Sequence, residues 1–335
     1  MKEMISVALI GLGRLGISHV GNLLKIRNFN LGIVCDNKLE IAQEVAMKYG
    51  IPQYTERPED IFEDESIQAV VIVSSTTTHF ELVTGALKAG KAVFVEKPLT
   101  LDLEESLKIE QVLVETNGFC QIGFMRRFDF DYMEAKRAIN EGAIGQPIYF
   151  KSISRDPYAP PLSFIERSGG IFIDLMIHDI DLAHYLMGTT VSEIAAFGSI
   201  IKYPEFSQVG DVDQALAFLK FENGYIGDLE GSRNAFYGYD VRTEVIGTEG
   251  TLLIGSNRKS NVQILTDSGN RHEIIPVFQE RFTSAYVNEL SAFANAIEQG
   301  LPSLATVSDS IRALKVAHAA TQSFKQNGVL IPTNA

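Results

Sequence analysis

Short apolar runs alternate with longer amphipathic stretches through the N-terminal part of the chain. The apolar runs are rich in β-branched residues and are too short for helices, and they span 6–11, 30–36, 69–74, 92–96 and 119–124. Between them, 40–49, 78–89 and 103–116 carry apolar residues at helical spacing. Strands that are apolar throughout and separated by helices indicate βαβ units and a parallel sheet covered on both faces.

The pattern changes from about residue 123 onward, where strands joined by tight turns replace the alternation. Turn signals stand at Asn223-Gly224, Glu249-Gly250 and Ser268-Gly269. They predict a large, mostly antiparallel open sheet with helices on one face. The segments 284–299 and 308–324 have helical apolar spacing that suits a core. We therefore expect an α/β chain with a first domain over 1–122 and an α+β domain over 123–335, which supplies substrate binding and oligomerisation.

A glycine motif, "GLGRLG", stands between the first strand and the first helix. Gly11 permits the tight turn, Gly13 lets a pyrophosphate approach the backbone, and Gly16 allows close packing of helix and strand. Asp36 lies twenty positions after Gly16 at the end of the next strand, where its carboxylate can bind ribose hydroxyls. The first domain is therefore predicted to be a Rossmann fold that binds NAD. NADP is less favoured because Asp36 would repel a 2′-phosphate, although the nearby Lys38 keeps it possible.

Further cofactor contacts are expected where the other strands end, because ligands of open α/β sheets bind at that edge. Ser75, Thr76 and His79 follow one strand, and helix capping is an equally good explanation of this Ser/Thr run. Lys97 follows another strand and precedes Pro98. The complete set of expected cofactor-binding residues is Gly11, Gly13, Arg14, Leu15, Gly16, Asp36, Ser75, Thr76, His79, Glu96 and Lys97.

Polar side chains interrupt the apolar stretch "FIDLMIHDIDLAHYL" at 172–186. At about 100° per residue, a continuous helix would place Asp174, His178, Asp181 and Tyr185 on one side. Such a stripe is either an exposed polar face with local Asp–His pairs or a set of catalytic groups facing a pocket. Asp174, His178 and Asp181 could also bind a metal ion, but we expect no metal.

Composition and charge exclude several classes of partner. The 335 residues are 45% hydrophobic and 21% charged, with 29 basic and 42 acidic residues and a net charge of −13. No basic run is present, so binding to nucleic acid or to an anionic membrane is not expected. Cys35 and Cys120 lie in apolar segments and are interpreted as buried thiols. No apolar run is long enough to span a membrane, and we expect a cytoplasmic protein.

The motifs "GLGRLG", "VEKPLT", "GFMRRFD" and "SGGIFIDLMIHDIDLAHYL", in this order over nearly the whole chain, resemble the glucose–fructose oxidoreductase/inositol dehydrogenase/rhizopine-catabolism family. Its inositol 2-dehydrogenase branch is the most similar. The resemblance implies that Lys97, Asp174 and His178 are catalytic. It also implies NAD-dependent oxidation of a cyclic polyol, with myo-inositol oxidised to 2-keto-myo-inositol as the first expectation. His178 would act as general base, Lys97 would stabilise the alkoxide, and Asp174 would orient the imidazole or the substrate.

Other polar residues are candidates for binding the polyol. The expected substrate contacts are Lys97, Arg127, Arg155, Asp156, Asp174, His178 and Tyr237. Several have a structural alternative: Arg126 suits an ion pair, and Tyr237 suits sheet packing. Asp181 and His184 are interpreted as structural. Some inositol dehydrogenases carry histidine and asparagine where Ser154 and Asp156 fall, which leaves the preferred stereoisomer open.

Three other functions suit the same motifs. The chain could be a dehydrogenase for another inositol or for a glucose-like sugar, because a fold does not fix its substrate. An NAD-dependent glycoside hydrolase and a non-catalytic NAD-sensing regulator are the others. The resemblance also implies a homo-oligomer, often a tetramer, formed through the open sheet face. The strand "ALAFLKF" supports this expectation because it leaves apolar residues that need a second cover.

Overall fold

The computed structural model describes residues 4–334, which fall into two compact units. The first unit comprises the residues up to Phe128 together with Ser284–Ile311, and the second comprises Asp129–Thr283 and the residues from Arg312 onward. The segment 284–311 thus belongs with the N-terminal residues although it lies far along the chain.

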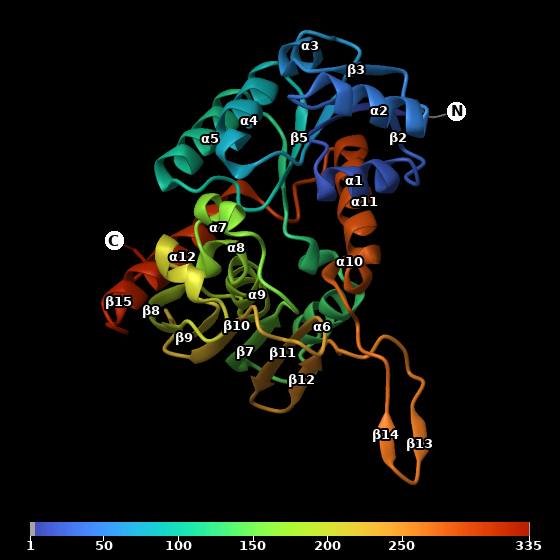
Figure 1. Cartoon of the computed structure of the whole chain (residues 1–335). Coiled ribbons are helices and arrows are strands. Elements are labelled where there is room, and N and C mark those ends of the chain that lie inside the picture. The colour runs from blue at the N-terminus through green and yellow to red at the C-terminus, as the bar shows by residue number, and fades with distance from the viewer. Residues whose placement is uncertain (1–3, 335) are drawn as a thin grey trace. The chain divides into compact units, whose positions relative to one another are not determined.

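The first unit is built on a six-stranded parallel sheet with the strand order β3-β2-β1-β4-β5-β6 (Figure 1). The strands are β1 (Ile5–Ile10), β2 (Phe29–Cys35), β3 (Gln53–Thr55), β4 (Ala69–Ile72), β5 (Ala92–Glu96) and β6 (Cys120–Gly123). The helices between them are α1 (Arg14–Leu23), α2 (Leu39–Tyr49), α3 (Pro58–Phe62), α4 (His79–Lys88) and α5 (Leu103–Glu115), with the 3₁₀ turns η1 (Thr76–Thr78) and η2 (Met125–Phe128). The predicted parallel Rossmann fold is confirmed.

The core of the first unit forms because its strands are apolar on both sides. Val7, Leu9 and Phe94 are buried, and they share one cluster with Leu290 and Phe293 of α11 (Thr283–Gln299). The ring centroids of Phe94 and Phe293 lie 5.9 Å apart. The apolar stripe of α11 therefore lies in the core, as its spacing predicted, and it packs against the N-terminal sheet.

The second unit contains a seven-stranded sheet with the strand order β12-β11-β7-β10-β9-β8-β15. The strands are β7 (Pro147–Arg155), β8 (Val191–Ser199), β9 (Gln214–Phe221), β10 (Ile226–Ser232), β11 (Asp240–Gly247), β12 (Thr251–Ile254) and β15 (Ile331–Pro332). All neighbouring strands pair antiparallel except β7 and β10, which are parallel. The prediction of a mostly antiparallel sheet is confirmed.

The remaining elements of the second unit are helices and one small hairpin. The helices are α6 (Phe130–Asn140), α7 (Leu162–Ser168), α8 (Ile171–Asp174), α9 (Ile177–Met187) and α10 (Phe278–Arg281), and η3 (Pro204–Val209) is a 3₁₀ turn. The helix α12 (Val307–Lys325) belongs to the first unit up to Ile311 and to the second from Arg312 onward. The strands β13 (Ile264–Thr266) and β14 (Gly269–Arg271) form a separate two-stranded sheet (Figure 1). Each of the three predicted tight turns joins two antiparallel strands.

The prediction of one continuous helix over 172–186 is wrong, because the chain forms α8 and α9 with a break at Leu175 and Met176. The N–H of Met176 donates to the carbonyl of Ile171, five residues earlier, which is one residue more than in a regular helix. Asp174 therefore ends one helix while His178 lies in the first turn of the next. Because of this break, Asp174, His178, Asp181 and Tyr185 do not form one stripe along a single helix.

Candidate active site

The glycine turn after β1 has the geometry that a dinucleotide requires. Gly11 has a φ of +96°, and a Cβ there would lie 2.6 Å from the amide nitrogen of Ser74. A Cβ on Gly16 would lie 1.9 Å from the carbonyl oxygen of Gly11. No atom lies within 4 Å of the Cβ position of Gly13, and no side chain caps α1 at this residue. The start of α1 therefore leaves room for a pyrophosphate at a helix N-terminus, where the first N–H groups have no partner within the helix.

Asp36 holds the glycine turn as well as being placed for ribose. One oxygen of its carboxylate accepts a hydrogen bond from the Leu12 N–H at 2.9 Å, and the other accepts from the Lys38 N–H at 3.1 Å. The side chain is only half-buried. A carboxylate in this place can accept hydrogen bonds from ribose hydroxyls and repels a phosphate, which favours NAD over NADP.

The candidates after β4 differ in their exposure. Ser75 is exposed and Thr76 half-buried, whereas His79 is buried. The His79 Nδ1 lies 3.0 Å from the carbonyl oxygen of Pro98, and its Nε2 lies 3.3 Å from that of Ser74. Burial lowers the pKa of His79, although the hydrogen bonds to backbone carbonyls and the nearby Glu96 oppose the decrease. Its observed role is to tie the segment after β5 to the segment after β4.

Lys97 follows β5 and is half-buried, and its bond to Pro98 is cis. The preceding Glu96 is buried, and its side chain is directed into the first unit. The Oε1 atom of Glu96 lies 2.8 Å from the Nε2 atom of His19. The structure thus gives Glu96, which the sequence suggested as a cofactor ligand, a partner inside the protein.

In the second unit, a buried arginine forms ion pairs with two of the predicted site residues. Arg233 is only 1% exposed, and its Nη2 atom lies 3.0 Å from Oδ2 of Asp174. Its Nη1 atom lies 3.7 Å from Oδ2 of Asp156. Nearby, Asp211 accepts a hydrogen bond from the Ile171 N–H at 3.0 Å. Burial raises the pKa of Asp211, although hydrogen bonds and Arg233 oppose the increase. We call Asp156, Asp174, Asp211 and Arg233 the arginine cluster.

Sequence reasoning missed Arg233 because a single arginine after a strand has no distinctive pattern. The signal lies in strand pairing: β7 and β10 are parallel, and Ser232 pairs with Arg155. The residues that follow both strands, Asp156 and Arg233, therefore emerge at the same end of the sheet. A prediction of this parallel pair would have brought them together.

His178 lies in the first turn of α9 and is 7% exposed. The next residue, Asp179, anchors the helix to the sheet: it accepts hydrogen bonds from the hydroxyls of Ser152 at 2.6 Å and Ser154 at 2.9 Å. Asp181 and His184 are also buried. Ser154 thus helps to fix the helix that carries His178.

Arg155 and Tyr237 belong to a different network. Alternation along β7 turns Ser152 and Ser154 toward α9, so Arg155 lies on the opposite face of the sheet. It forms an ion pair with Glu230 at 2.7 Å, and its Nη1 donates to the hydroxyl of Tyr237 at 3.1 Å. That hydroxyl in turn donates to Asp240 at 2.8 Å. These contacts favour a structural role for both residues.

Arg127, another expected substrate contact, is buried in the first unit. Its Nη1 atom donates to the Leu304 carbonyl at 2.9 Å and to Oδ2 of Asp309 at 3.0 Å. Burial alone would raise the pKa of Asp309, but the Arg127 guanidinium and the hydrogen bonds from Thr306 outweigh it and lower the pKa to about 2. These contacts fasten η2 to the first turn of α12 and to the segment before it.

Comparison with known families accounts for nearly the whole chain. Residues 5–124 match the family model described as the NAD-binding Rossmann fold of the GFO/IDH/MocA oxidoreductases, and residues 136–331 match the C-terminal alpha/beta domain of the same family. The chain belongs to the GFO/IDH/MocA oxidoreductase family. The resemblance seen in the motifs is therefore confirmed, as are the oxidoreductase class and the NAD cofactor.

Individual relatives are similar over their full length. A scyllo-inositol 2-dehydrogenase (NAD(+)) of Bacillus subtilis is 46% identical over 98% of this chain and 96% of its own. A myo-inositol 2-dehydrogenase of Thermotoga maritima is 37% identical over 96% of each chain. Among solved structures, a scyllo-inositol dehydrogenase of Lactobacillus casei with bound NAD(H) and scyllo-inositol has a TM-score of 0.94 and 33% identity, covering 99% of this chain and 100% of its own.

Proposed function

We propose that the protein is an NAD-dependent inositol 2-dehydrogenase that oxidises a secondary ring hydroxyl to a ketone. The full-length similarity to inositol dehydrogenases carries this proposal. The polar chemistry of the chain supports it, since Lys97, Asp174 and His178 occur in one protein with a glycine turn built for a dinucleotide.

Each catalytic side chain has a distinct role in the proposed reaction. When bound, the nicotinamide supplies the hydride acceptor for the carbinol carbon. His178 takes the proton of the hydroxyl, because an imidazole can exchange protons near neutral pH. Lys97 donates a hydrogen bond to the oxygen as negative charge develops on it. Asp174, held by Arg233, orients the imidazole or a neighbouring substrate hydroxyl.

Two stereoisomers are candidate substrates. The sequence motifs put myo-inositol first, and the 37% identical relative is named for it. The 46% identical relative is named for scyllo-inositol, which makes this isomer an equally specific candidate. The two isomers differ at a single carbon, and oxidation there gives the same 2-keto product because it removes the stereocentre.

Kinetic measurements with a defined panel test the function. Reduction of NAD and NADP is followed by absorbance with myo-, scyllo- and chiro-inositol and with glucose. We expect turnover with myo- or scyllo-inositol and NAD, with one NADH formed per polyol oxidised. Absence of turnover with every inositol would refute the assignment. A sugar released without net NADH would instead support a glycoside hydrolase.

Two variants test the assigned roles. Lys97→Met and His178→Ala should lower kcat by about 100-fold or more, since such groups typically contribute roughly 10²–10⁴ in rate. NAD binding, measured by fluorescence titration, should change little. His318→Ala, which alters a histidine of α12, is the matched control and should retain turnover. Near-normal kcat in either catalytic variant would exclude that residue from the reaction.

We also propose that the open face of the larger sheet binds a second copy of the chain. Along β9, buried and exposed residues alternate, which leaves Leu216 and Phe218 exposed by 37% and 51%. On β8, Phe197 is 49% exposed and pairs directly with Leu216. An apolar face of this kind marks an interaction site. Phe218→Lys should reduce the mass measured by sedimentation, whereas Phe130→Lys, on α6, should not.

A further inference from the structure

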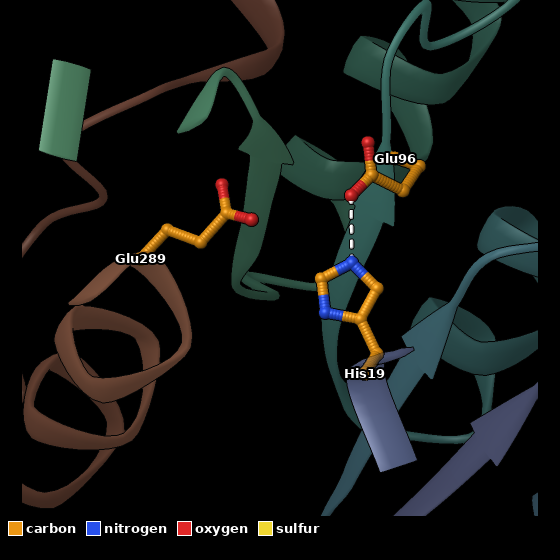
Figure 2. A group of neighbouring side chains, drawn as sticks. All are labelled: His19, Glu96 and Glu289. Atoms are coloured by element: carbon orange, nitrogen blue, oxygen red, sulfur yellow. Dashed lines mark hydrogen bonds and ion pairs between the residues drawn. The ribbon is translucent and has the colours of Figure 1, made fainter. Parts of the chain in front are cut away.

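A second polar cluster is buried within the first unit, and the proposed chemistry does not use it directly. His19 of α1, Glu96 of β5 and Glu289 of α11 point toward one another (Figure 2). They are 0%, 6% and 0% exposed. Their nearest ligand atoms all lie within 4.8 Å of one another. We call these three residues the carboxyl–imidazole cluster.

The two carboxyl groups of this cluster have unequal partners. The Oε1 atom of Glu96 receives a hydrogen bond from His19 at 2.8 Å, the dashed line in Figure 2. Neither carboxyl oxygen of Glu289 has a hydrogen-bond partner among the described residues. An ionised carboxylate buried without a partner is strongly unfavourable, so the group becomes protonated. Burial and the nearby Glu96 raise the pKa of Glu289 well above its ordinary value, which agrees with this conclusion.

Glu96 links the cluster to Lys97. While Oε1 of its carboxylate is held by His19, Oε2 accepts the backbone N–H of Lys97 at 3.3 Å. Gly123, which pairs with Glu96 across β5 and β6, leaves the space for this carboxylate. A Cβ on Gly123 would lie 2.9 Å from Oε2 and 3.2 Å from the Glu96 Cα. The position of the Lys97 backbone thus depends on where the Glu96 side chain is fixed.

Aromatic contacts hold the imidazole itself. The His19 ring stands edge-on to Tyr286, with centroids 5.5 Å apart, and to Phe94, with centroids 6.0 Å apart. Tyr286 lies on α11, the helix that also carries Glu289. The chain of contacts therefore runs from α11 through His19 to Glu96 and on to Lys97, all inside one unit.

We propose that His19 and Glu96 are positioning residues for Lys97, with a neutral Glu289 beside them. His19 fixes one oxygen of Glu96 so that the other receives the Lys97 backbone N–H, and Glu289 stays neutral behind them by retaining a proton. The inference rests on the proposed catalytic role of Lys97. A metal ion is the competing explanation of two carboxyls and an imidazole at this spacing. The short contact between Nε2 of His19 and Oε1 of Glu96 favours a protonated carboxyl over a metal ion, because these two atoms already bind each other.

The kinetic test compares substitutions of His19. His19→Phe keeps an aromatic ring but removes the donor to Glu96, and we expect kcat with the best inositol to fall by about 10-fold to 100-fold. KM and the affinity for NAD, measured by fluorescence titration, should change by less than about threefold. His19→Gln restores an N–H donor and should recover most of the loss. A structural role alone would lower the amount of folded enzyme without lowering kcat per NAD-binding site.

A second pair of variants tests Glu96 without changing any charge. Gly123→Ala places a methyl group against the Glu96 carboxylate and should lower kcat in the same way as His19→Phe. Gly21→Ala is the matched control, because nothing lies within 4 Å of its Cβ position. If Lys97→Met abolishes turnover while His19→Phe and Gly123→Ala keep normal kcat, the positioning role is refuted and the proposed function stands. If Lys97→Met itself remains active, the proposed function is what fails.

The protonation of Glu289 is tested separately by infrared spectroscopy and metal analysis. A protonated carboxylic acid has a C=O band that ionised carboxylates lack. This band should be present in the wild-type protein at neutral pH and missing in Glu289→Gln. Metal bound stoichiometrically by the purified protein, and lost in Glu289→Gln, would overturn the proposal in favour of a cation site. Absence of the band would overturn it as well.

Discussion

The arginine cluster and the carboxyl–imidazole cluster solve the same electrostatic problem in different ways. In the second unit, Asp156 and Asp174 bind the guanidinium of Arg233, which supplies a cation to the buried carboxylates. In the first unit, His19 and the Lys97 N–H hold Glu96, whereas the Glu289 carboxyl has no hydrogen-bond partner among the described residues and is neutralised by a proton. The comparison teaches that the arginine cluster should lose most when its cation is removed, whereas the carboxyl–imidazole cluster should make stability depend on pH.

The largest expected effect comes from removing the cation of the arginine cluster. Arg233→Met keeps most of the volume but takes the guanidinium away from Asp174. Breaking a buried ion pair in this way costs roughly 3–5 kcal/mol of stability. The Asp174 side chain is 17% exposed, so we expect a value near the lower end. Denaturant unfolding measures the loss, and kcat should fall with it because Asp174 loses its orientation.

Arg242→Met is the matched control for this prediction. Arg242 also binds an aspartate, Asp240, at 2.8 Å, and its own side chain is 48% exposed although Asp240 is buried. Without Arg242 the Asp240 carboxylate keeps the Tyr237 hydroxyl at 2.8 Å and Arg155 at 3.8 Å, so the loss of stability should be smaller than for Arg233→Met. Equal losses in the two variants would show that Arg233 does not hold a buried carboxylate cluster together, and the contrast between the two clusters would disappear.

The next effect tests the proton of the carboxyl–imidazole cluster. The pKa of Glu289 is raised on folding, so the folded state holds a proton that the unfolded chain releases above its ordinary pKa of 4.5. The stability that this proton contributes is therefore fully present below pH 4.5, and it falls as the pH rises toward the pKa of Glu289 in the folded protein. One such proton gives a slope of about 1.4 kcal/mol per pH unit.

Glu289→Gln should remove that slope, because glutamine is neutral throughout. The unfolding free energies of the wild-type protein and the variant are compared from pH 5 to pH 8 by denaturant titration. The difference between them should shift in favour of the variant as the pH rises, at about 1.4 kcal/mol per pH unit for as long as Glu289 keeps its proton in the folded state. Parallel curves would contradict the assignment, because Glu289 would then titrate in the folded protein as it does in the unfolded one.

The sequence could predict what depends on local pattern. Apolar runs gave the parallel strands, and the spacing of Gly11, Gly13, Gly16 and Asp36 predicted a turn that the structure has. The break between α8 and α9 was not predicted, because "FIDLMIHDIDLAHYL" contains neither glycine nor proline to mark it. A wide turn at Met176 depends on tertiary packing, which local spacing does not encode.

The rest of the site depends on pairings between distant segments. His19 and Glu96 are 77 positions apart, and Glu289 reaches them from a helix that apolar spacing identified only as core. Arg233 joins Asp156 and Asp174 because β7 and β10 are parallel neighbours. A single sequence does not indicate which distant residues become neighbours, because each of these polar residues, considered alone, could equally lie on the surface.

The smallest effect sharpens the comparison inside the first unit, where Arg127 and Asp309 form a buried ion pair. The pKa of Asp309 is about 2, against an ordinary value of 3.8. A carboxyl with a lowered pKa contributes stability that is present above pH 3.8 and lost as the pH falls through 2. The depression corresponds to about 2 kcal/mol. Asp309→Asn should therefore be less stable than the wild type by about this amount at pH 7, and the difference should shrink as the pH falls toward 2. A gap that stays constant in acid would mean that packing, and not the charge of Asp309, accounts for the loss. Asp309 would then not be a cation-compensated carboxylate to set against Glu289.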